Sequence, residues 1–371
     1  MARTASAARR EPQLRNTPAT LAPALALDLG GTRLRGAVVG GDGRLVSRHV
    51  VPTPQADAAT VLAACVDVLR RALAAAPRLA QPPVAIGISA PGPIDARRGM
   101  LIDPPNLHRS TWGLPLAQLL ADELGLPAAL EKDTNVAALG ESWFGSARGV
   151  DDFIYLTVST GIGGAAVSGG RLLTGPDGVG GELGHICVDA FDGPMCGCGA
   201  RGHLEALASG TGIAAAARAA GMGDSTSAAQ VAAAEAAGDA QAQQVMERAR
   251  QAFAAALVTI VDVFNPSLIV VGGGIASGQG DTLLEPARRA VASQAFKVQA
   301  RRAKIVPARL GDDVGLVGAL VLANAAVDEA TAALGLKPGA MSPGRSALSN
   351  DPARADDETA SKTTTDAVAL G

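Results

Sequence analysis

The sequence of 371 residues has few aromatic residues, no long apolar segment and little excess charge. Aromatic side chains make up 2% of the chain, which argues against a surface that stacks single-stranded nucleic-acid bases. No segment approaches the roughly 20 consecutive apolar residues of a membrane span. The 32 basic and 35 acidic residues give a net charge of −3, so neither DNA nor anionic lipid is an expected partner.

Cysteine is also scarce, with four residues in the chain. So few cysteines do not form a disulfide framework, and a single residue separates Cys196 from Cys198, which suggests metal ligands. The N-terminal segment contains arginines but no apolar run behind them, so it does not resemble a secretory signal. The sequence therefore predicts a cytoplasmic protein without a membrane or nucleic-acid partner.

What the chain does contain is enough apolar material for a folded core. Hydrophobic residues make up 48% of it, and the length leaves room for about two domains. Strand-like and helix-like segments alternate between residues 23 and 330, which predicts an α/β fold. The polar ends, 1–22 and 336–371, are predicted to be disordered tails.

The apolar periodicity predicts individual elements. A hairpin is expected from strands at 23–29 and 34–40, and further strands at 84–92, 153–160 and 267–274. Helices are expected at 57–76, 116–124, 134–144, several within 211–263, and a closing helix at 315–330.

Two distant segments resemble each other. Residues 35–45 are similar to 163–172, and each segment follows a turn of small residues. This similarity predicts two lobes of similar build. The alternative is that small hairpins resemble one another by composition alone.

A glycine-rich turn occurs in each half. Asp28 closes the first strand before Gly30, Gly31 and Thr32, and Thr160-Gly161 lies in a similar turn of the second half. Glycine lets the backbone approach an anion closely, so the two turns suggest phosphates held from both lobes, with Asp28 holding a hard cation. Taken singly, an ordinary hairpin turn explains each motif equally well.

Two more motifs suggest a nucleotide and a reacting hydroxyl. Gly273 and Gly274 follow an apolar strand, where small residues permit a purine or ribose to lie flat; a strained turn is the alternative. Asp133 begins a predicted helix after a strand, where it is either an N-cap or a general base for a substrate hydroxyl. Phosphoryl transfer requires such a carboxylate together with charge neutralisation.

Histidine and cysteine gather in one loop. His185, Cys196, Cys198 and His203 lie within a stretch of nineteen residues and offer two thiolates and two imidazoles. That donor set suits a tetrahedral Zn²⁺ site that would fasten a glycine-rich loop. The alternative is that His203 caps a helix and the loop binds no metal.

The order of these motifs resembles the ROK family (repressors, open reading frames and sugar kinases) of the actin/hexokinase superfamily. The resemblance covers about residues 24–330. It rests on DLGGT (28–32), APGPID (90–95), PPNLHRSTW (104–112), EKDTNVAALGE (131–141), STGIGG (159–164), GGELGH (180–185), the Cys/His cluster with Glu205, and VVGGGI (270–275).

The resemblance implies a two-lobed, duplicated actin/hexokinase-like (ribonuclease H-like) α/β fold with a cleft between the lobes. The implied N-terminal lobe is 23–130, closed by the helix 315–330, and the C-terminal lobe is 131–314 with the zinc loop. The implied activity is ATP-dependent transfer of the γ-phosphoryl group to the primary (6-) hydroxyl of a hexose, as in a glucokinase. The implied cofactors are ATP, Mg²⁺ and structural Zn²⁺, and the implied assembly is a homodimer.

The resemblance also assigns roles to residues. Asp133 corresponds to the family's catalytic base, and Asp28 to the acidic residue near Mg²⁺. The residues that correspond to sugar-binding positions are Asn106, Glu182, His185 and Glu205. The ATP-binding positions are Gly30, Gly31, Thr32, Thr160, Gly161, Gly273 and Gly274, and the zinc positions are His185, Cys196, Cys198 and His203.

Two residues depart from the family pattern. Lys132 stands where the family usually has the asparagine that bonds the sugar, and His203 where it usually has a third cysteine. An ammonium only donates hydrogen bonds, whereas an amide also accepts them, so an amino sugar, an N-acyl sugar or a sugar-like cyclitol is an alternative acceptor. ATP and polyphosphate are both open as donors.

The alternative of another class is a non-catalytic, sugar-sensing regulator. About 22 polar residues precede the first predicted strand, which is too short for a helix-turn-helix module.

Overall fold

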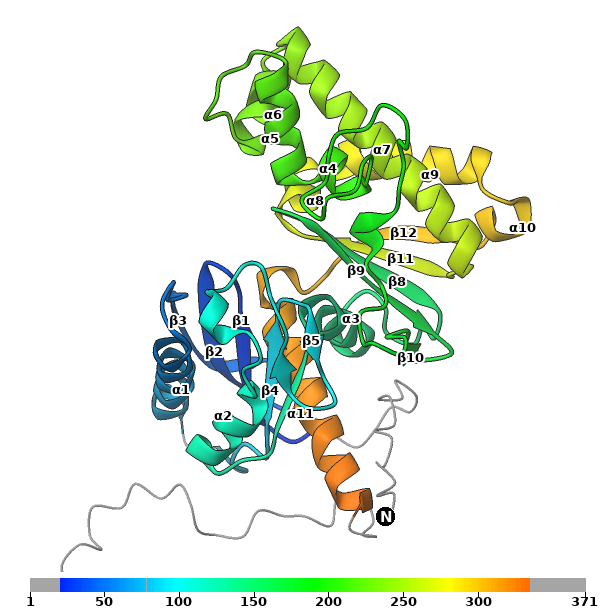
Figure 1. Cartoon of the computed structure of the whole chain (residues 1–371). Helices are drawn as coiled ribbons and strands as arrows, with labels where there is room; N and C mark the ends of the chain where they lie inside the picture. The colour runs from blue at the N-terminus through cyan, green and yellow to red at the C-terminus, as the bar shows by residue number, and fades with distance from the viewer. Residues whose placement is uncertain (1–20, 78, 334–371) are drawn as a thin grey trace, which may run out of the picture.

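Two five-stranded sheets form the framework of the computed structural model, which describes residues 21–77 and 79–333 (Figure 1). The first sheet has the order β3-β2-β1-β4-β7. Its strands are β1 (Ala24–Leu29), β2 (Arg33–Val39), β3 (Leu45–Pro52), β4 (Ile86–Ala90) and β7 (Ala128–Lys132). A small two-stranded sheet, β5 (Ile94–Asp95) with β6 (Met100–Leu101), lies beside it.

The second sheet repeats this topology, with the order β10-β9-β8-β11-β12. Its strands are β8 (Phe153–Val158), β9 (Ile162–Ser168), β10 (Arg171–Leu172), β11 (Leu268–Gly272) and β12 (Lys304–Pro307). In both sheets the first strand forms an antiparallel hairpin with the second and pairs in parallel with a later strand. The similar build expected from the two hairpins, and the duplicated actin/hexokinase-like fold, are therefore confirmed.

Helices cover the sheets in three layers (Figure 1). α1 (Ala58–Ala75) and α2 (Leu116–Leu124) share a core with the first sheet. α3 (Asp133–Phe144) and α11 (Val314–Ala333) contribute to a core that also contains residues of both sheets, so they lie between the two halves. The outer side of the second sheet carries α4 (Leu204–Ala208), α5 (Gly210–Ala219), α6 (Ala228–Ala236), α7 (Ala240–Phe264), α8 (Gly274–Gln279), α9 (Asp281–Gln294) and α10 (Lys297–Ala300).

The two central helices approach each other closely because glycine stands at their contact. A Cβ atom at Gly318 of α11 would lie 1.9 Å from the backbone oxygen of Val136 in α3. Any side chain there would force the helices apart. This contact sets the spacing between α3, which begins at Asp133, and α11, whose first turn lies beside Asp28.

Most of the expected elements are confirmed, including the first hairpin and the helix α2. The strands β3 and β12 and the helix α9 were not predicted. β3 and β12 are edge strands with exposed residues, so they lack the continuous apolar run of a central strand. α9 contains Pro286, which argues against a helix in a sequence pattern.

The predicted tails, 1–22 and 336–371, lie outside the described residues except for Leu21 and Ala22. Ala22 exchanges two hydrogen bonds with the side chain of Asn324 in α11, at 2.9 and 3.0 Å, so this residue is tied to α11 ahead of the first strand. The limits 23–130 and 131–314 for the two lobes stay predictions.

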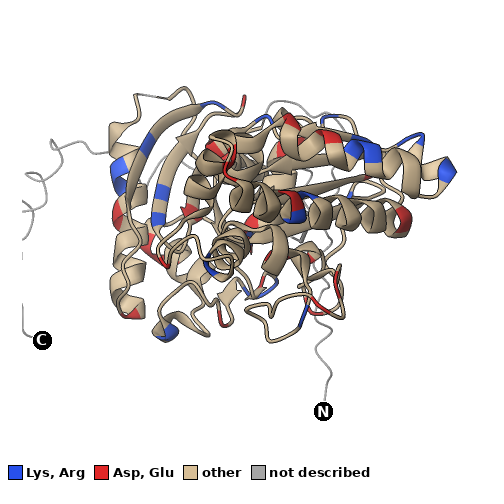
Figure 2. Cartoon of the chain, turned by 90° about the horizontal axis from the view of Figure 1, so that it is seen from above, with Lys and Arg blue, Asp and Glu red and all other residues tan. Residues whose placement is uncertain are grey.

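Charged residues of both signs are interspersed over the elements seen in Figure 2. Within the described ranges, no helix combines the length and the apolar character that crossing a membrane requires.

Candidate functional site

The junction of β7 and α3 places Asp133 at the start of a helix between the two sheets. Lys132 occupies the N-cap position without a side-chain cap, and Asp133 is the first helical residue. The Oδ1 atom of Asp133 accepts the backbone N–H of Thr134 at 2.7 Å. The N-cap interpretation of Asp133 is therefore wrong by one position, although a carboxylate in the first turn still suits the positive end of the helix dipole.

The carboxyl group of Asp133 has a raised pKa. Asp133 is an exposed residue, yet the protein packed around its carboxyl group removes much of that group's hydration. This burial raises the pKa of Asp133 to about 6, against the opposing effect of the Thr134 N–H. The charges of Asp28 and Glu182 also raise the pKa and that of Lys132 lowers it, so all three charges act on Asp133. A carboxylate with this pKa is ionised at neutral pH and accepts a proton more readily than an ordinary aspartate.

Asp28 is fixed in position by three neighbours. Its carboxylate forms an ion pair with Arg35, its cross-strand neighbour on β2, and accepts the Ser89 hydroxyl at 3.0 Å. The first turn of α11 lies against it, since a Cβ atom at Gly315 would be 3.1 Å from the Asp28 Cγ. A divalent cation at Asp28 would therefore have to share the carboxylate with Arg35 or contact it through water.

Thr53, the residue that follows β3, anchors the first glycine turn. The Thr53 hydroxyl donates to the backbone oxygen of Gly30 at 2.6 Å, and the Thr53 N–H donates to that of Thr32 at 3.0 Å. Gly31 lies against Asn106, because a Cβ atom at Gly31 would be 2.9 Å from the Asn106 Cβ. The turn predicted to hold phosphate is thus adjacent to a residue predicted to bind sugar.

The second glycine turn contacts Glu205 and α3. The backbone N–H of Ile162 donates to Glu205 Oε2 at 2.9 Å, and a Cβ atom at Gly161 would lie 2.6 Å from the same oxygen. The backbone oxygen of the preceding Thr160 accepts the N–H of Thr211 at 3.1 Å. A Cβ atom at Gly163 would lie 2.7 Å from the Thr134 Cγ2, so this turn also borders the start of α3.

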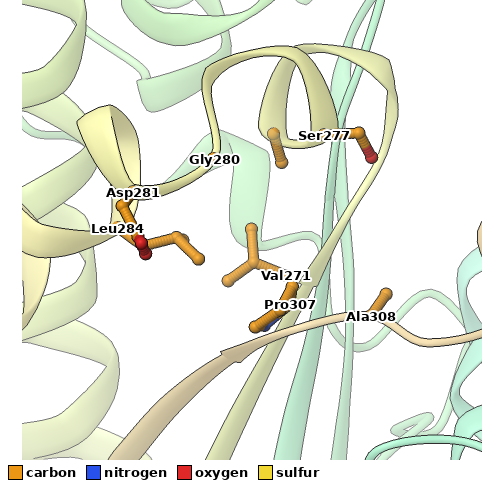
Figure 3. Close-up of a pocket in the computed structure, with 8 residues that line it drawn as sticks. Val271, Ser277, Gly280, Asp281, Leu284, Pro307 and Ala308 are labelled. Carbon is orange, nitrogen blue, oxygen red and sulfur yellow. The ribbon is translucent and has the colours of Figure 1, made fainter.

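The third glycine turn joins β11 to α8. Gly273 has a φ of 93° and precedes the helix that begins at Gly274, so the strained-turn interpretation holds for Gly273. A cavity of about 260 Å³ opens beside this turn, where β11 and β12 end against α8 and α9 (Figure 3). Its lining includes Val271, Ser277, Asp281, Leu284 and Pro307. Its mixed apolar and polar walls suit a flat heterocycle with a few hydrogen-bonding groups.

The four predicted zinc ligands come together. One ligand atom from each of His185, Cys196, Cys198 and His203 lies within 4.8 Å of the others. The Nδ1 atoms of the two histidines are 3.2 Å apart, and the His203 Nδ1 is 3.3 Å from the Cys198 Sγ. His203 stands at the N-cap position of α4 but makes no side-chain cap, so capping does not explain it. Two thiolates and two imidazoles in this arrangement fit Zn²⁺.

The cysteine cluster adjoins the predicted sugar residues. Glu205 Oε1 is 3.8 Å from the Cys196 Sγ, and His185 is itself one of the four clustered residues. All four cysteines are free thiols, with Cys65 buried in the first lobe and Cys187 exposed outside the cluster.

The sequence patterns missed two ion pairs of the site. Arg35 pairs with Asp28, and Lys132 donates to Glu182 Oε1 at 2.9 Å and to the backbone oxygen of Gly180 at 3.3 Å. The hairpin pairs residue 28 with residue 35, so a register argument would have revealed the first pair. The second joins β7 to a distant loop, and no local pattern signals it.

Comparisons with known proteins agree with this architecture. The model of the ROK family matches residues 24–326. The chain is 35% identical over 311 residues to a glucokinase of Thermotoga maritima, covering 80% of this chain and 95% of that protein. It is 36% identical over 304 residues to an N-acetylmannosamine kinase of Escherichia fergusonii, covering 81% and 98%. A solved ROK family glucokinase from Streptomyces griseus in complex with glucose and AMPPNP has a TM-score of 0.68 and 32% identity, covering 81% and 99%.

Proposed function

This chain belongs to the ROK family and is an ATP-dependent carbohydrate kinase, and we propose that it phosphorylates the primary hydroxyl of a hexose with Asp133 as the general base. The observation that carries this proposal is the position of Asp133. Its carboxylate lies at the start of α3, within reach of the charges of Asp28, Lys132 and Glu182, and its raised pKa suits proton acceptance. The glucose and AMPPNP named for the Streptomyces griseus relative support a hexose and ATP as substrates.

In the proposed reaction the Asp133 carboxylate takes the proton of the sugar's primary hydroxyl as that oxygen attacks the γ-phosphorus. Asn106, Glu182, His185 and Glu205 hold the other hydroxyls, so the attacking oxygen is positioned before the reaction. In the turns at Gly30–Thr32 and Thr160–Gly161 backbone N–H groups bind the triphosphate, except the Gly30 N–H, which donates to the backbone oxygen of Arg33 at 3.0 Å. Gly273 and Gly274 receive the adenosine, with the neighbouring cavity available for the base.

Two metals complete the proposal. Mg²⁺ bound beside Asp28 would neutralise charge on the β- and γ-phosphates. Zn²⁺ held by His185, Cys196, Cys198 and His203 would fix the loop that carries the sugar-binding His185. The zinc would be structural, because four protein ligands would leave no open position for substrate.

A second candidate acceptor is an N-acyl sugar. The N-acetylmannosamine kinase at 36% identity supports it, as does Lys132, which offers only donors to a substrate oxygen. An assay of sugar-phosphate formation from glucose, mannose, N-acetylmannosamine, glucosamine and a cyclitol, with ATP and with polyphosphate as donors, identifies the acceptor and the donor.

The replacement of Asp133 by asparagine tests the catalytic assignment. We expect Asp133→Asn to lower kcat by roughly 10²–10⁴-fold while the sugar's affinity, measured by calorimetry, stays nearly unchanged. Asp122→Asn, an exposed aspartate on α2, is the matched control. Full turnover in Asp133→Asn would exclude it as the base, and sugar binding without ADP release from any acceptor would favour a sugar-sensing regulator.

A further inference from the structure

Lys132 is a buried ammonium next to the proposed acceptor site. It is the last residue of β7, and its side chain is 6% exposed. Its aliphatic stem packs near Gly92, where a Cβ atom would lie 3.4 Å from the Lys132 Cδ. Burying a charge is costly unless it is paired and hydrogen-bonded, so the position of this ammonium is closely determined by its partners.

The partners of Lys132 lie in a loop that follows a strand of the second sheet. The Lys132 Nζ donates to Glu182 Oε1 and to the Gly180 backbone oxygen, both in the loop that follows β10. The Glu182 side chain is 44% exposed, so one part of this carboxylate meets Lys132 while another part is open to solvent. The pair joins the end of β7 to the loop that leads into the zinc cluster.

The pair also acts on the reacting centre. Lys132 precedes Asp133 in the chain, and the charges of both Lys132 and Glu182 affect the Asp133 carboxyl group. A sugar whose hydroxyl contacts Asp133 therefore lies within the electrostatic range of both charges. Since Lys132 balances the charge of Glu182, this carboxylate is not free to pair with a substrate ammonium.

The Lys132 ammonium only donates hydrogen bonds, and this limits the groups that a substrate can place beside it. Lysine has three N–H donors and no acceptor, and two of these donors are directed to Glu182 and Gly180. A substrate group that meets the remaining donor has to offer an oxygen lone pair, as a hydroxyl, an acyl carbonyl or a carboxylate does. A substrate ammonium would be repelled by Lys132 and would compete with it for Glu182.

We propose that Lys132, paired with Glu182, is a specificity-determining residue that selects acceptor sugars bearing hydroxyl, acyl or carboxylate oxygens and rejects sugars bearing a free ammonium group. This inference rests on the proposed sugar-kinase function. It narrows the acceptors left open by the sequence, because free amino sugars are disfavoured whereas N-acyl sugars are not.

Glucose and glucosamine form the test pair, because they have nearly the same shape and differ in charge. The measurement is the ratio of kcat/KM for glucosamine to that for glucose at pH 6.5, where the amine is protonated. We expect Lys132→Asn to raise this ratio at least about tenfold over the wild type and Lys132→Arg, which keeps the charge, to leave it within about threefold. Glu182→Gln should change the ratio in the opposite direction, because it removes the carboxylate that balances the Lys132 charge.

Lys297→Asn, on the exposed helix α10, is the control for a general loss of positive charge and should leave the ratio unchanged. An unchanged ratio in an active Lys132→Asn enzyme overturns the inference, as does a ratio that rises equally in Lys132→Arg. If Lys132→Asn fails to fold, a lower ratio in Glu182→Gln supports the inference and a higher or equal ratio overturns it.

A failure of the proposed kinase function can be distinguished from a failure of this inference. If the wild type phosphorylates no sugar, the same variants are compared by calorimetric affinity for the two sugars. A relative gain in glucosamine affinity in Lys132→Asn then supports the charge selection without catalysis. The same ratio of glucosamine to glucose affinity in Lys132→Asn and the wild type, or no binding of either sugar, overturns it.

Discussion

Glu141, near the end of α3, accepts the backbone N–H of Leu310 at 2.9 Å across 169 residues of sequence. The same carboxylate accepts the N–H groups of Arg309 and Ser146, at 2.9 and 2.6 Å. Two segments that run between the sheets, the one after α3 and the one between β12 and α11, are thus tied to one fully buried side chain. This tie fixes α3, and therefore Asp133, relative to α11.

Replacing this carboxylate should destabilise the fold. Glu141→Ala leaves three backbone donors without a protein acceptor, and each such donor costs about 1–3 kcal/mol when buried. Since water can enter the space, we expect a loss of roughly 3 kcal/mol in the free energy of unfolding, measured by urea denaturation. Glu247→Ala, on an exposed part of α7, should change stability by less than about 0.5 kcal/mol. Equal stability of the two variants would contradict the role of Glu141.

The rate of phosphoryl transfer should depend on pH through Asp133. A general base acts only when deprotonated, and the pKa of Asp133 is raised to about 6. We therefore expect kcat/KM to fall as the pH drops below about 6, approaching tenfold per pH unit. Initial rates between pH 4.5 and 8, at saturating ATP and Mg²⁺, measure this limb. Constant activity down to pH 4.5 would show that Asp133 has an ordinary pKa or is not the base.

The same raised pKa predicts an effect on stability. Because the pKa is higher in the folded than in the unfolded protein, the native state binds the proton more tightly. The contribution of Asp133 is thus most favourable below about pH 4 and is lost as the pH rises through about 6. Asp133→Asn should therefore stabilise the protein relative to the wild type at pH 7 and less so at pH 4. Chemical denaturation at both pH values provides the comparison, and a variant less stable at pH 7 would contradict it.

The zinc site can be tested with two neighbouring cysteines. We expect the purified protein to contain about one zinc ion per chain by elemental analysis, and Cys198→Ser to lose it and melt at a lower temperature. Cys187→Ser should keep the metal, because Cys187 lies in the same loop but outside the cluster. Zinc retained in Cys198→Ser, or absent from the wild type after purification without chelators, would exclude the site.

Gly161 should be intolerant of a side chain. A Cβ atom there would overlap Glu205 Oε2, so Gly161→Ala displaces a residue proposed to bind the sugar. We expect the KM for the sugar to rise about tenfold, equivalent to about 1.4 kcal/mol. Gly278→Ala is the control, because a Cβ atom at Gly278 meets open space. If the two variants have the same KM, Glu205 does not contact the sugar.

The sequence by itself determined the fold class, the family and the position of most catalytic candidates. Apolar runs, glycine turns and the spacing of histidine and cysteine are local signals, and they located β1, β2, α2, the start of α3 and the histidine and cysteine residues that cluster. These signals are local because strand burial and tight turns each impose residue types at short separations, as does a metal-ligand pattern. The edge strands β3 and β12 lacked such a signal, since their side chains are partly exposed.

Only the tertiary structure decided which charges meet in the site. Lys132 with Glu182, Arg35 with Asp28, and Glu141 with the backbone of residues 309 and 310 are contacts between elements that no single periodic pattern describes. The pKa of an ionisable group depends on its burial and on the charges near it in space. The packing of the two sheets around α3 and α11 brings these neighbours together. The sequence therefore supplied the chemical groups, whereas the fold set their pairing and the raised pKa of Asp133.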